Sequence, residues 1–116
     1  MDSLKIIHDI YVNSKGELWF LSAGRIHRHN LKTNEHKAYS PPDFFHATSI
    51  SETEKGEMWF SSTDGYLRRL DESHGTFAKY SLFDRDTPVP LRRISKIMAD
   101  KQGTLFAGTE SQGIKA

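Results

Sequence analysis

Two short stretches decide the fold: "GELWF" at Gly16–Phe20 and "GEMWF" at Gly56–Phe60, whose glycines are 40 positions apart. A related stretch, "GTLFAGT", lies at Gly103–Thr109, and its first glycine comes 47 positions after that of the second stretch. Three similar stretches at periods of 40 to 50 residues indicate a repeat architecture.

The similarity extends to both sides of the three glycines. An isoleucine lies six residues before each glycine, an aliphatic residue or methionine two residues after it, and an aromatic residue three residues after it. The equivalent positions are Ile10, Leu18, Trp19 and Phe20 in the first repeat, Ile50, Met58, Trp59 and Phe60 in the second, and Ile97, Leu105, Phe106 and Ala107 in the third.

Each repeat is predicted to consist of short strands. The polar tetrads NSKG, TEKG and DKQG end in the three glycines and predict tight hairpin turns with a positive φ at glycine. Near-continuous apolar runs follow them, which is typical of a strand buried on both faces. Two further strands, RIHRHN and HKAYS or YLRRLD and FAKYS, complete the first and second repeats. Four short strands in roughly 40–50 residues are the unit of a β-propeller blade.

The sequence therefore predicts an all-β fold of antiparallel four-stranded β-propeller blades. Residues 1–40 form the first blade, residues 41–93 the second, with a long inter-blade loop at 81–93, and residues 94–116 part of a third. Since propellers need roughly four to eight blades to close, about two and a half blades predict an incomplete propeller. A fragment of a larger propeller is the favoured explanation, and a remnant of a split gene and a subunit that closes a ring by assembly are the alternatives. The structural repeat residues are Gly16, Gly56 and Gly103 in turns, and Trp19, Trp59 and Phe106 packed between blades.

Composition excludes several classes of function. The net charge is +1, from 16 basic and 15 acidic residues, so charge gives no argument for binding nucleic acid. The chain has no cysteine, which excludes disulfides and thiolate metal sites. No apolar run approaches the roughly 20 residues that cross a bilayer. The stretch MDSLKIIHDIYV has an acidic second residue and no long apolar core, so we do not expect it to act as a signal peptide. We therefore expect neither membrane contact by this segment nor a cofactor.

The order and spacing of these elements resemble the two-component regulator propeller repeat. The second repeat matches best, through Gly56, Leu67, Arg69, Asp71, Phe77 and Tyr80. The chain departs from the family pattern at Asn30, which stands where the second repeat has an aspartate, and at His27 and His29, where aromatic residues are usual. It also departs at Phe106, which replaces tryptophan.

The resemblance implies a role in signal transduction. Similar repeats build the ligand-sensing, periplasmic region of hybrid histidine kinases of the inner membrane, which respond to carbohydrates. A glycan would then be the ligand of the full-length sensor, and neighbouring blades or other copies of the chain would be its protein partners. The chain contains no kinase motif, so we expect no enzymatic activity from it and assign no catalytic residue. If the chain exists alone, exposed blade faces are expected to pair, giving a homo-oligomer.

Two loops exceed the minimum length and are candidates for a ligand site: residues 40–46, SPPDFFH, and residues 81–93, SLFDRDTPVPLRR. Insertions in repeat proteins tend to lie on one face, often the binding face. In the second loop an aromatic ring among carboxylates and guanidinium groups suits a sugar. The candidate ligand-binding residues are Phe83, Asp84, Arg85, Asp86, Arg92 and Arg93. The alternative is a solvated loop held by Pro88 and Pro90.

The histidines and arginines of the third strands allow two interpretations each. His27 and His29 are two positions apart and point to one face of a strand, an arrangement that can form half of a metal site. Spacing indicates no third ligand, so surface or inter-blade histidines are the alternative and no metal site is predicted. Arg28 and Arg69 occupy equivalent repeat positions, which favours a structural ion pair over an acidic-glycan site.

Two other functions stay open at this point. One is a propeller lyase or lactonase-like enzyme with a metal in the central channel, since such enzymes use similar strands. The other is a propeller that only binds proteins. Ser22, Ser62 and Thr109 occupy equivalent repeat positions, so none of them is a unique candidate nucleophile.

Overall fold

Three antiparallel sheets follow one another along the chain. The structure, a computed structural model, describes residues 7–22, 24–41 and 46–115. Within them each sheet keeps the order of the sequence: β1-β2-β3-β4, then β5-β6-β7-β8, then β9-β10-β11. The strands are β1 (Asp9–Val12), β2 (Glu17–Ser22), β3 (Arg25–Asn30), β4 (His36–Tyr39), β5 (Ala47–Glu52), β6 (Met58–Ser62), β7 (Tyr66–Asp71), β8 (Thr76–Ser81), β9 (Ile94–Ala99), β10 (Leu105–Thr109) and β11 (Ile114–Lys115).

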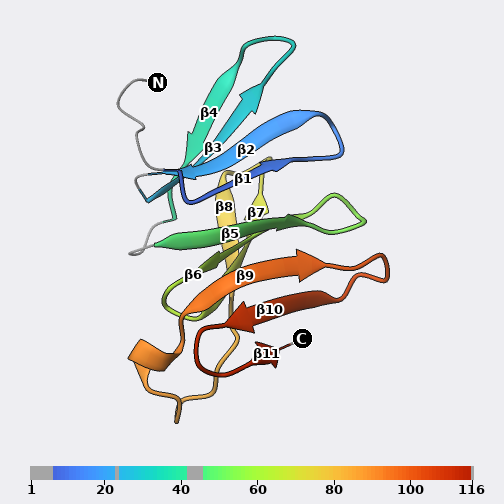
Figure 1. The fold of residues 1–116 in the computed structure, drawn as a ribbon. Helices are drawn as coiled ribbons and strands as arrows, with labels where there is room; N and C mark the ends of the chain where they lie inside the picture. Colours follow the sequence, from blue (N-terminus) through green and yellow to red (C-terminus); the bar gives the residue numbers. More distant parts are fainter. Residues whose placement is uncertain (1–6, 23, 42–45, 116) are drawn as a thin grey trace.

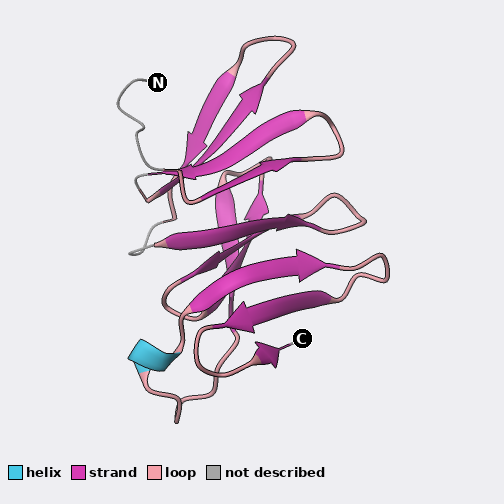
Figure 2. Cartoon of the chain, viewed as in Figure 1, coloured by secondary structure: helices cyan, strands magenta, loops and turns pink. Residues whose placement is uncertain are grey.

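The sheets are stacked as blades, with the first at the top of Figure 1, the second in the middle and the third at the bottom. The first strands β1, β5 and β9 lie side by side and point the same way, and their hairpin turns gather at one edge of the stack. Figure 2 shows that the described residues are almost entirely strand and loop, with one 3-10 helix, Val89–Leu91, in the long inter-blade loop. The described strands form three consecutive blades of a β-propeller and do not close a ring.

The hairpin turns form as the sequence predicts. Gly16, Gly56 and Gly103 have φ values of 76°, 84° and 87°, which suit only glycine well. The N–H of Gly16 donates to the carbonyl of Asn13 at 3.0 Å, and the side-chain oxygen of Asn13 accepts the N–H of Glu17 at 2.8 Å. The other two turns repeat this pattern, so the first polar residue of each tetrad caps its own turn.

A hydrophobic core lies in each of the two spaces between blades. Between blades 1 and 2, Trp19 packs against Phe60 at 6.0 Å between ring centroids and stacks on Tyr39 at 6.1 Å. Between blades 2 and 3 the core is smaller; its buried residues are Leu67, Phe83, Ile94, Ile97 and Ala107, with Trp59, Leu82 and Leu105 packed against them.

The three repeat aromatics differ in burial. Trp19 is 0% exposed, Trp59 is half-buried and Phe106 is 39% exposed. Trp19 lies in the core between blades 1 and 2, Trp59 packs against the core between blades 2 and 3, and Phe106 is on the outer side of the last described blade. The reason is that each aromatic points toward the following blade, and Phe106 has no described blade beyond it.

The third blade has three strands in the described part of the chain, and its last strand, β11, has only two residues. Its first strand, β9, is nevertheless bonded to blade 2. The hydroxyls of Ser49 and Ser51 accept the N–H groups of Ile97 and Ala99 at 3.1 and 3.0 Å. Blades 1 and 2 have the same type of link, because the carboxylate of Asp9 accepts the N–H of Ile50 at 2.8 Å.

Candidate functional site

A polar cleft of about 320 Å³ lies where the first strands of all three blades begin. We call it the mouth cleft. Equivalent repeat positions of the blades line it. His8, Thr48 and Ser95 each lie two residues before a repeat isoleucine, and other lining residues come from the turns between second and third strands. The lining residues are His8, Ser22, Gly24, His46, Ala47, Thr48, Thr63, Arg93, Ser95 and Glu110.

A repeated backbone hydrogen bond positions the lining. In blade 2 the N–H of Thr63 donates to the carbonyl of His46 at 3.0 Å, and in blade 3 the N–H of Glu110 donates to the carbonyl of Arg93 at 3.1 Å. Each bond ties the residue just before an inner strand to the turn beside it. The lining is therefore held by two inner-strand and turn pairs of the same construction.

The charged groups of the mouth cleft are accessible. The Nε of Arg93 lies 3.3 Å from Oε2 of Glu110, and both side chains are more than half exposed. An exposed pair of this kind contributes about 0–1 kcal/mol to stability. Breaking it to contact a ligand therefore costs little.

The chemistry of the cleft suits a small polar ligand. Hydroxyls of Ser22, Thr48, Thr63 and Ser95, two imidazoles, one guanidinium and one carboxylate offer both donors and acceptors. Among the residues that the structure describes, no group of three or more His, Asp or Glu side chains is arranged to hold a metal ion.

The 81–93 loop does not bring its six candidate residues to one site. Phe83 is only 7% exposed and belongs to the core between blades 2 and 3, so its predicted role in stacking on a ligand is corrected to core packing. Gly65 allows this packing, because a Cβ there would lie 2.8 Å from Cδ2 of Phe83 and 2.7 Å from Cβ of Arg92.

Arg92 and Asp84 hold the loop together. The Nε of Arg92 donates to the carbonyl of Thr87 at 2.7 Å, and its Nη2 lies within 3.3 Å of the carbonyls of Asp84 and Arg85. The carboxylate of Asp84 accepts the N–H of Asp86 at 3.2 Å. These bonds fit the alternative interpretation, a solvated loop. That interpretation expected Pro88 and Pro90 to hold the loop, whereas the hydrogen bonds come from Arg92 and Asp84.

The candidate ligand-binding residues therefore lie on two separate surfaces. An open groove of about 540 Å³ is lined by Phe83, Asp84, Arg85 and Arg92. Asp86 is exposed nearby, whereas Arg93 lines the mouth cleft. Residues 42–45 of the first candidate loop lie outside the described residues, but His46 at its end also lines the mouth cleft.

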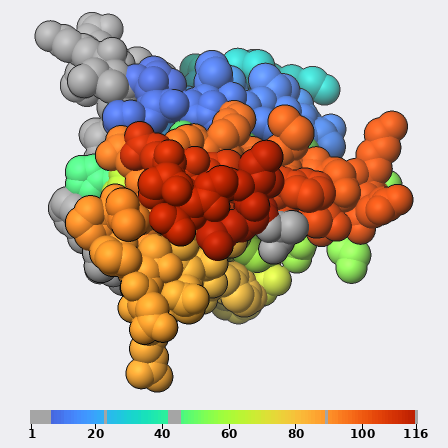
Figure 3. Space-filling view, turned by 60° about the horizontal axis from the view of Figure 1, so that its bottom comes forward, coloured from blue at the N-terminus to red at the C-terminus, as the bar shows by residue number. Residues whose placement is uncertain are grey.

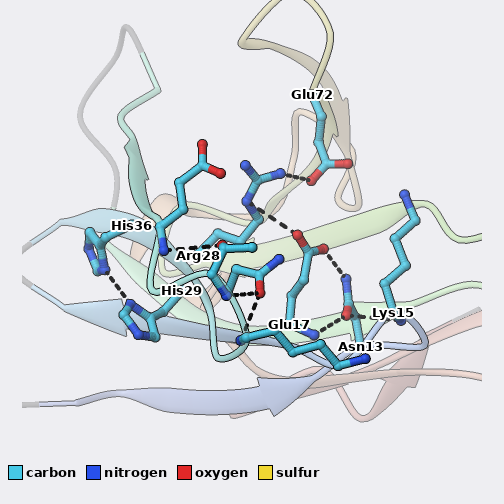
Figure 4. A network of polar contacts seen from close by, with 11 residues as sticks. Asn13, Lys15, Glu17, Arg28, His29, His36 and Glu72 are labelled. Atoms are coloured by element: carbon cyan, nitrogen blue, oxygen red, sulfur yellow. Dashed lines mark hydrogen bonds and ion pairs between the residues drawn. The ribbon is translucent and has the colours of Figure 1, made fainter.

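The structure adds a third histidine to the pair in β3. The register of β3 and β4 places His36 opposite His29. The Nδ1 of His27 lies 3.1 Å from Nε2 of His36, and the Nδ1 atoms of His36 and His29 are 3.4 Å apart, as the close-up in Figure 4 shows for the latter pair. Burial lowers the pKa of His27, and the neighbouring His36 lowers it further. Strand register, rather than spacing along one strand, was the signal that could have identified His36.

The repeat arginines form structural ion pairs, as their position predicted. Arg28 contacts Glu17 at 3.6 Å and Glu72 of blade 2 at 3.3 Å, and Asn13 donates to Glu17 at 2.9 Å (Figure 4). The equivalent pair in blade 2 joins Arg69 to Glu57 at 3.5 Å. This pairing explains the glutamate in both GELWF and GEMWF.

Sequence comparison gives no further guidance. No protein-family model matches the chain, and a search of the curated proteins gave no match. Among the described residues, no helix is long and apolar enough to span a membrane.

Solved structures resemble the chain closely in fold. Virginiamycin B lyase from Staphylococcus aureus superposes with a TM-score of 0.73 at 23% identity, covering 94% of this chain and 40% of the lyase. The extracellular domain of a putative hybrid two-component system from B. thetaiotaomicron gives 0.69 at 22% identity, covering 93% of this chain and 16% of that domain. The WD40 β-propeller domain of Doa1 gives 0.72 at 17% identity, with coverages of 94% and 35%.

These similarities establish a β-propeller fold, and the chain spans 40% or less of the length of the three structures. At such identities the likeness concerns the fold alone. The neighbours include both lyases and sensor domains, so function must be argued from the site.

Proposed function

We propose that the chain is a ligand-sensing segment of a β-propeller and belongs to the periplasmic region of a hybrid two-component sensor histidine kinase. The observation that carries this proposal is the mouth cleft, to which three successive blades contribute equivalent positions. A ligand bound there contacts all three blades at once. The resemblance of the repeats and the extracellular sensor domains among the structural neighbours support the same assignment.

The proposed ligand is a carbohydrate. Hydroxyls and imidazoles of the cleft can exchange hydrogen bonds with sugar hydroxyls, and Arg93 can bind a sugar carboxylate when it leaves Glu110. The described lining of the cleft contains no Phe, Tyr or Trp side chain, so the contacts proposed for a sugar are hydrogen bonds.

Signalling then follows from a population shift. A ligand that contacts blades 1, 2 and 3 favours the arrangement of the blades in which all three contacts can form. The shift in this equilibrium is limited by the difference in the ligand's affinity for the two arrangements. The segment itself performs no chemistry in this proposal, and any kinase activity belongs to another part of the sensor.

A propeller lyase is the second candidate, because the lyase structures superpose with TM-scores of 0.69 to 0.73. Metal analysis of the purified chain separates the two functions. A stoichiometric divalent ion that is lost with activity on a cyclic substrate would support the lyase, whereas a sensor segment binds sugars without turnover.

The test of the sensing proposal is a titration followed by NMR, with neutral oligosaccharides and oligosaccharides that contain uronic acids. We expect chemical-shift changes at Thr48, Thr63 and Ser95, and binding of the acidic sugars that is about tenfold weaker in Arg93→Ala, a loss of about 1.4 kcal/mol. Arg85→Ala is the matched control, because Arg85 lines the other groove. Shifts confined to the 84–87 loop, or no shifts with any sugar of the panel, would contradict the proposal.

A further inference from the structure

The first strands of blades 2 and 3 break the regular alternation of side chains at equivalent positions. In a regular strand, residues three positions apart point to opposite faces. Ala47 and Ile50 are three positions apart, yet both are buried in the core between blades 1 and 2. Ile94 and Ile97 have the same spacing, and both are buried in the core between blades 2 and 3. One extra residue must therefore lie within each of these spans.

The strand register identifies the extra residues. In β5, Thr48 has no partner in β6, because Ala47 and Ser49 on either side of it pair with adjacent residues. In β9, Ser95 has no partner in β10 for the same reason. An unpaired residue of this kind is a β-bulge, which re-aims a side chain and is over-represented next to active sites.

Blade 1 has the corresponding geometry at His8. The pairing of β1 with β2 begins at Asp9 opposite Leu21. The N–H of His8 donates to the carbonyl of the same Leu21 at 2.9 Å, so two successive residues lie opposite one residue of β2. His8, Thr48 and Ser95 each lie two positions before a repeat isoleucine. The same feature therefore recurs in all three described blades, and we call these three positions the bulge residues.

The bulge residues lie close together because the strands that follow them are linked. The next residues are Asp9, Ser49 and Lys96. Asp9 accepts the N–H of Ile50 at 2.8 Å, and Ser49 accepts the N–H of Ile97 at 3.1 Å. The ammonium of Lys96 lies 3.2 Å from Oδ2 of Asp9, and Figure 3 shows blue atoms of blade 1 adjoining orange atoms of blade 3. All three bulge side chains therefore line the mouth cleft.

Each bulge side chain offers a polar group to the cleft. His8 and Ser95 are exposed, and neither side chain has a hydrogen-bond partner among the described residues. Thr48 is half-buried, and its hydroxyl lies 2.8 Å from that of the buried Ser61, which orients it and leaves further hydrogen-bonding capacity. The residue type at the bulge differs between blades, whereas the isoleucine two positions later is the same in all three.

We propose that the bulge residues His8, Thr48 and Ser95 determine the specificity of the mouth cleft, each binding a different hydroxyl of one sugar. Repeated residues build the frame around the bulges, so a new residue at a bulge changes the ligand contact without changing the blade. This inference rests on the proposed sensing function and extends it. Arg93 selects acidic over neutral sugars, whereas the bulge residues select among sugars by the positions of their hydroxyls.

The test is an NMR titration of the full chain with glucose, galactose and mannose and with their uronic acids. His8→Ala, Thr48→Val and Ser95→Ala each remove one polar group. Each is expected to weaken binding of a neutral sugar and of its acid equally, about three- to tenfold, the effect of losing one hydrogen bond. Arg93→Ala should weaken only the acids. Thr76→Val, at an exposed position of β8 outside the cleft lining, is the matched control and should bind like the wild type.

Deoxy sugars distinguish a direct contact from an effect on the shape of the cleft. The wild type should bind the sugar more weakly whenever a contacted hydroxyl is missing. Each bulge variant should lose its sensitivity to one hydroxyl, a different one for each variant, because the partner of that hydroxyl is already gone. Thr48→Ser and Ser95→Thr keep the protein hydroxyl and should restore binding.

The two proposals fail in different ways. If no sugar binds, the sensing function is wrong and this inference falls with it. If a sugar binds and Arg93→Ala weakens its acid, but the bulge variants bind like the wild type, sensing stands and the bulge residues do not set specificity. Bulge variants that bind more weakly but keep the wild-type sensitivity to every hydroxyl also overturn the inference. Circular dichroism of each variant shows that it is folded during the titration.

Discussion

The two inter-blade interfaces of this chain share a sequence pattern but differ in burial. Trp19, between blades 1 and 2, is completely buried, whereas Trp59, between blades 2 and 3, is only half-buried. The difference lies in the following blade. Residues of β7 and β8 belong to the core around Trp19, whereas the described part of blade 3 offers only the two-residue β11 outside β10. The burial of a repeat residue is therefore decided by the next repeat.

The inner halves of the interfaces are much more alike. Asp9 accepts the N–H of Ile50, and Ser49 accepts the N–H of Ile97. Both links use a side chain that lies one position before the repeat isoleucine. The inner strands are thus joined in the same way at both interfaces, and the outer strands account for the contrast.

The largest effect should come from removing the two tryptophans. Trp19→Ala is expected to lower the free energy of unfolding by about 3–5 kcal/mol, because it leaves a cavity in a packed interface. Trp59→Ala should cost roughly half as much, since part of that ring is already in water. Urea unfolding followed by circular dichroism measures both. Equal losses would mean that the two interfaces are equally packed, contrary to the structure.

Two adjacent arginines on opposite faces of blade 2 give the next effect. Arg68 is 1% exposed and contacts Asp64 at 3.0 Å and the hydroxyl of Ser62 at 2.9 Å. Burial raises the pKa of Asp64, but hydrogen bonds from Arg68 and Ser62 lower it below its ordinary value overall. Arg68→Met is expected to cost about 2–3 kcal/mol, since it removes one partner of a largely buried pair.

Arg69→Met is the matched control for that substitution. Its pair with Glu57 is about 40% exposed on both sides, so the expected cost is below about 1 kcal/mol. A larger loss for Arg69 than for Arg68 would show that the face of blade 2 toward blade 3 is the better packed one, and would reverse the comparison.

Single hydroxyls of the inner strands should have a smaller effect. Ser49→Ala removes the acceptor of a buried N–H and is expected to cost about 1–3 kcal/mol, with the lower end favoured if water replaces the hydroxyl. Ser73→Ala, in an exposed turn, should change stability by less than about 0.5 kcal/mol. Identical urea midpoints for the two variants would mean that the hydrogen bond between Ser49 and Ile97 does not contribute to stability.

The smallest expected effect is the pH dependence from His27. Because burial and His36 lower its pKa in the folded state, protonation disfavours folding. The contribution of His27 to the free energy of unfolding is fully present above the unfolded-state pKa of about 6.5. It decreases as the pH falls from there toward the folded-state pKa. Arg25 adds to the shift, whereas a hydrogen bond to Ser22 opposes it. His27→Gln should flatten the pH dependence of the urea midpoint between about pH 5 and 7. An unchanged pH dependence in this variant would contradict the lowered pKa of His27.

Sequence patterns sufficed for features that depend on neighbouring residues in the chain. The turn glycines, the strands and the structural role of Arg28 follow from local chemistry and from repetition, whereas the partners of Arg28, Glu17 and Glu72, came from the structure. The burial of Phe83 and the position of Arg93 in the mouth cleft did not follow, because they depend on how blade 3 folds back against blade 2. Polar residues between proline-containing turns look alike whether they cap a loop or face a ligand.

Hydrogen exchange of single amides tests the account most directly. The N–H groups of Ile50 and Ile97 are bonded to side chains of the preceding blade, so they are protected only if blades stack as described. The account predicts strong protection at Ile50 and weaker, but measurable, protection at Ile97, since the second interface opens more readily. Exchange at the rate of an unstructured peptide at Ile50, or stronger protection at Ile97 than at Ile50, would contradict it.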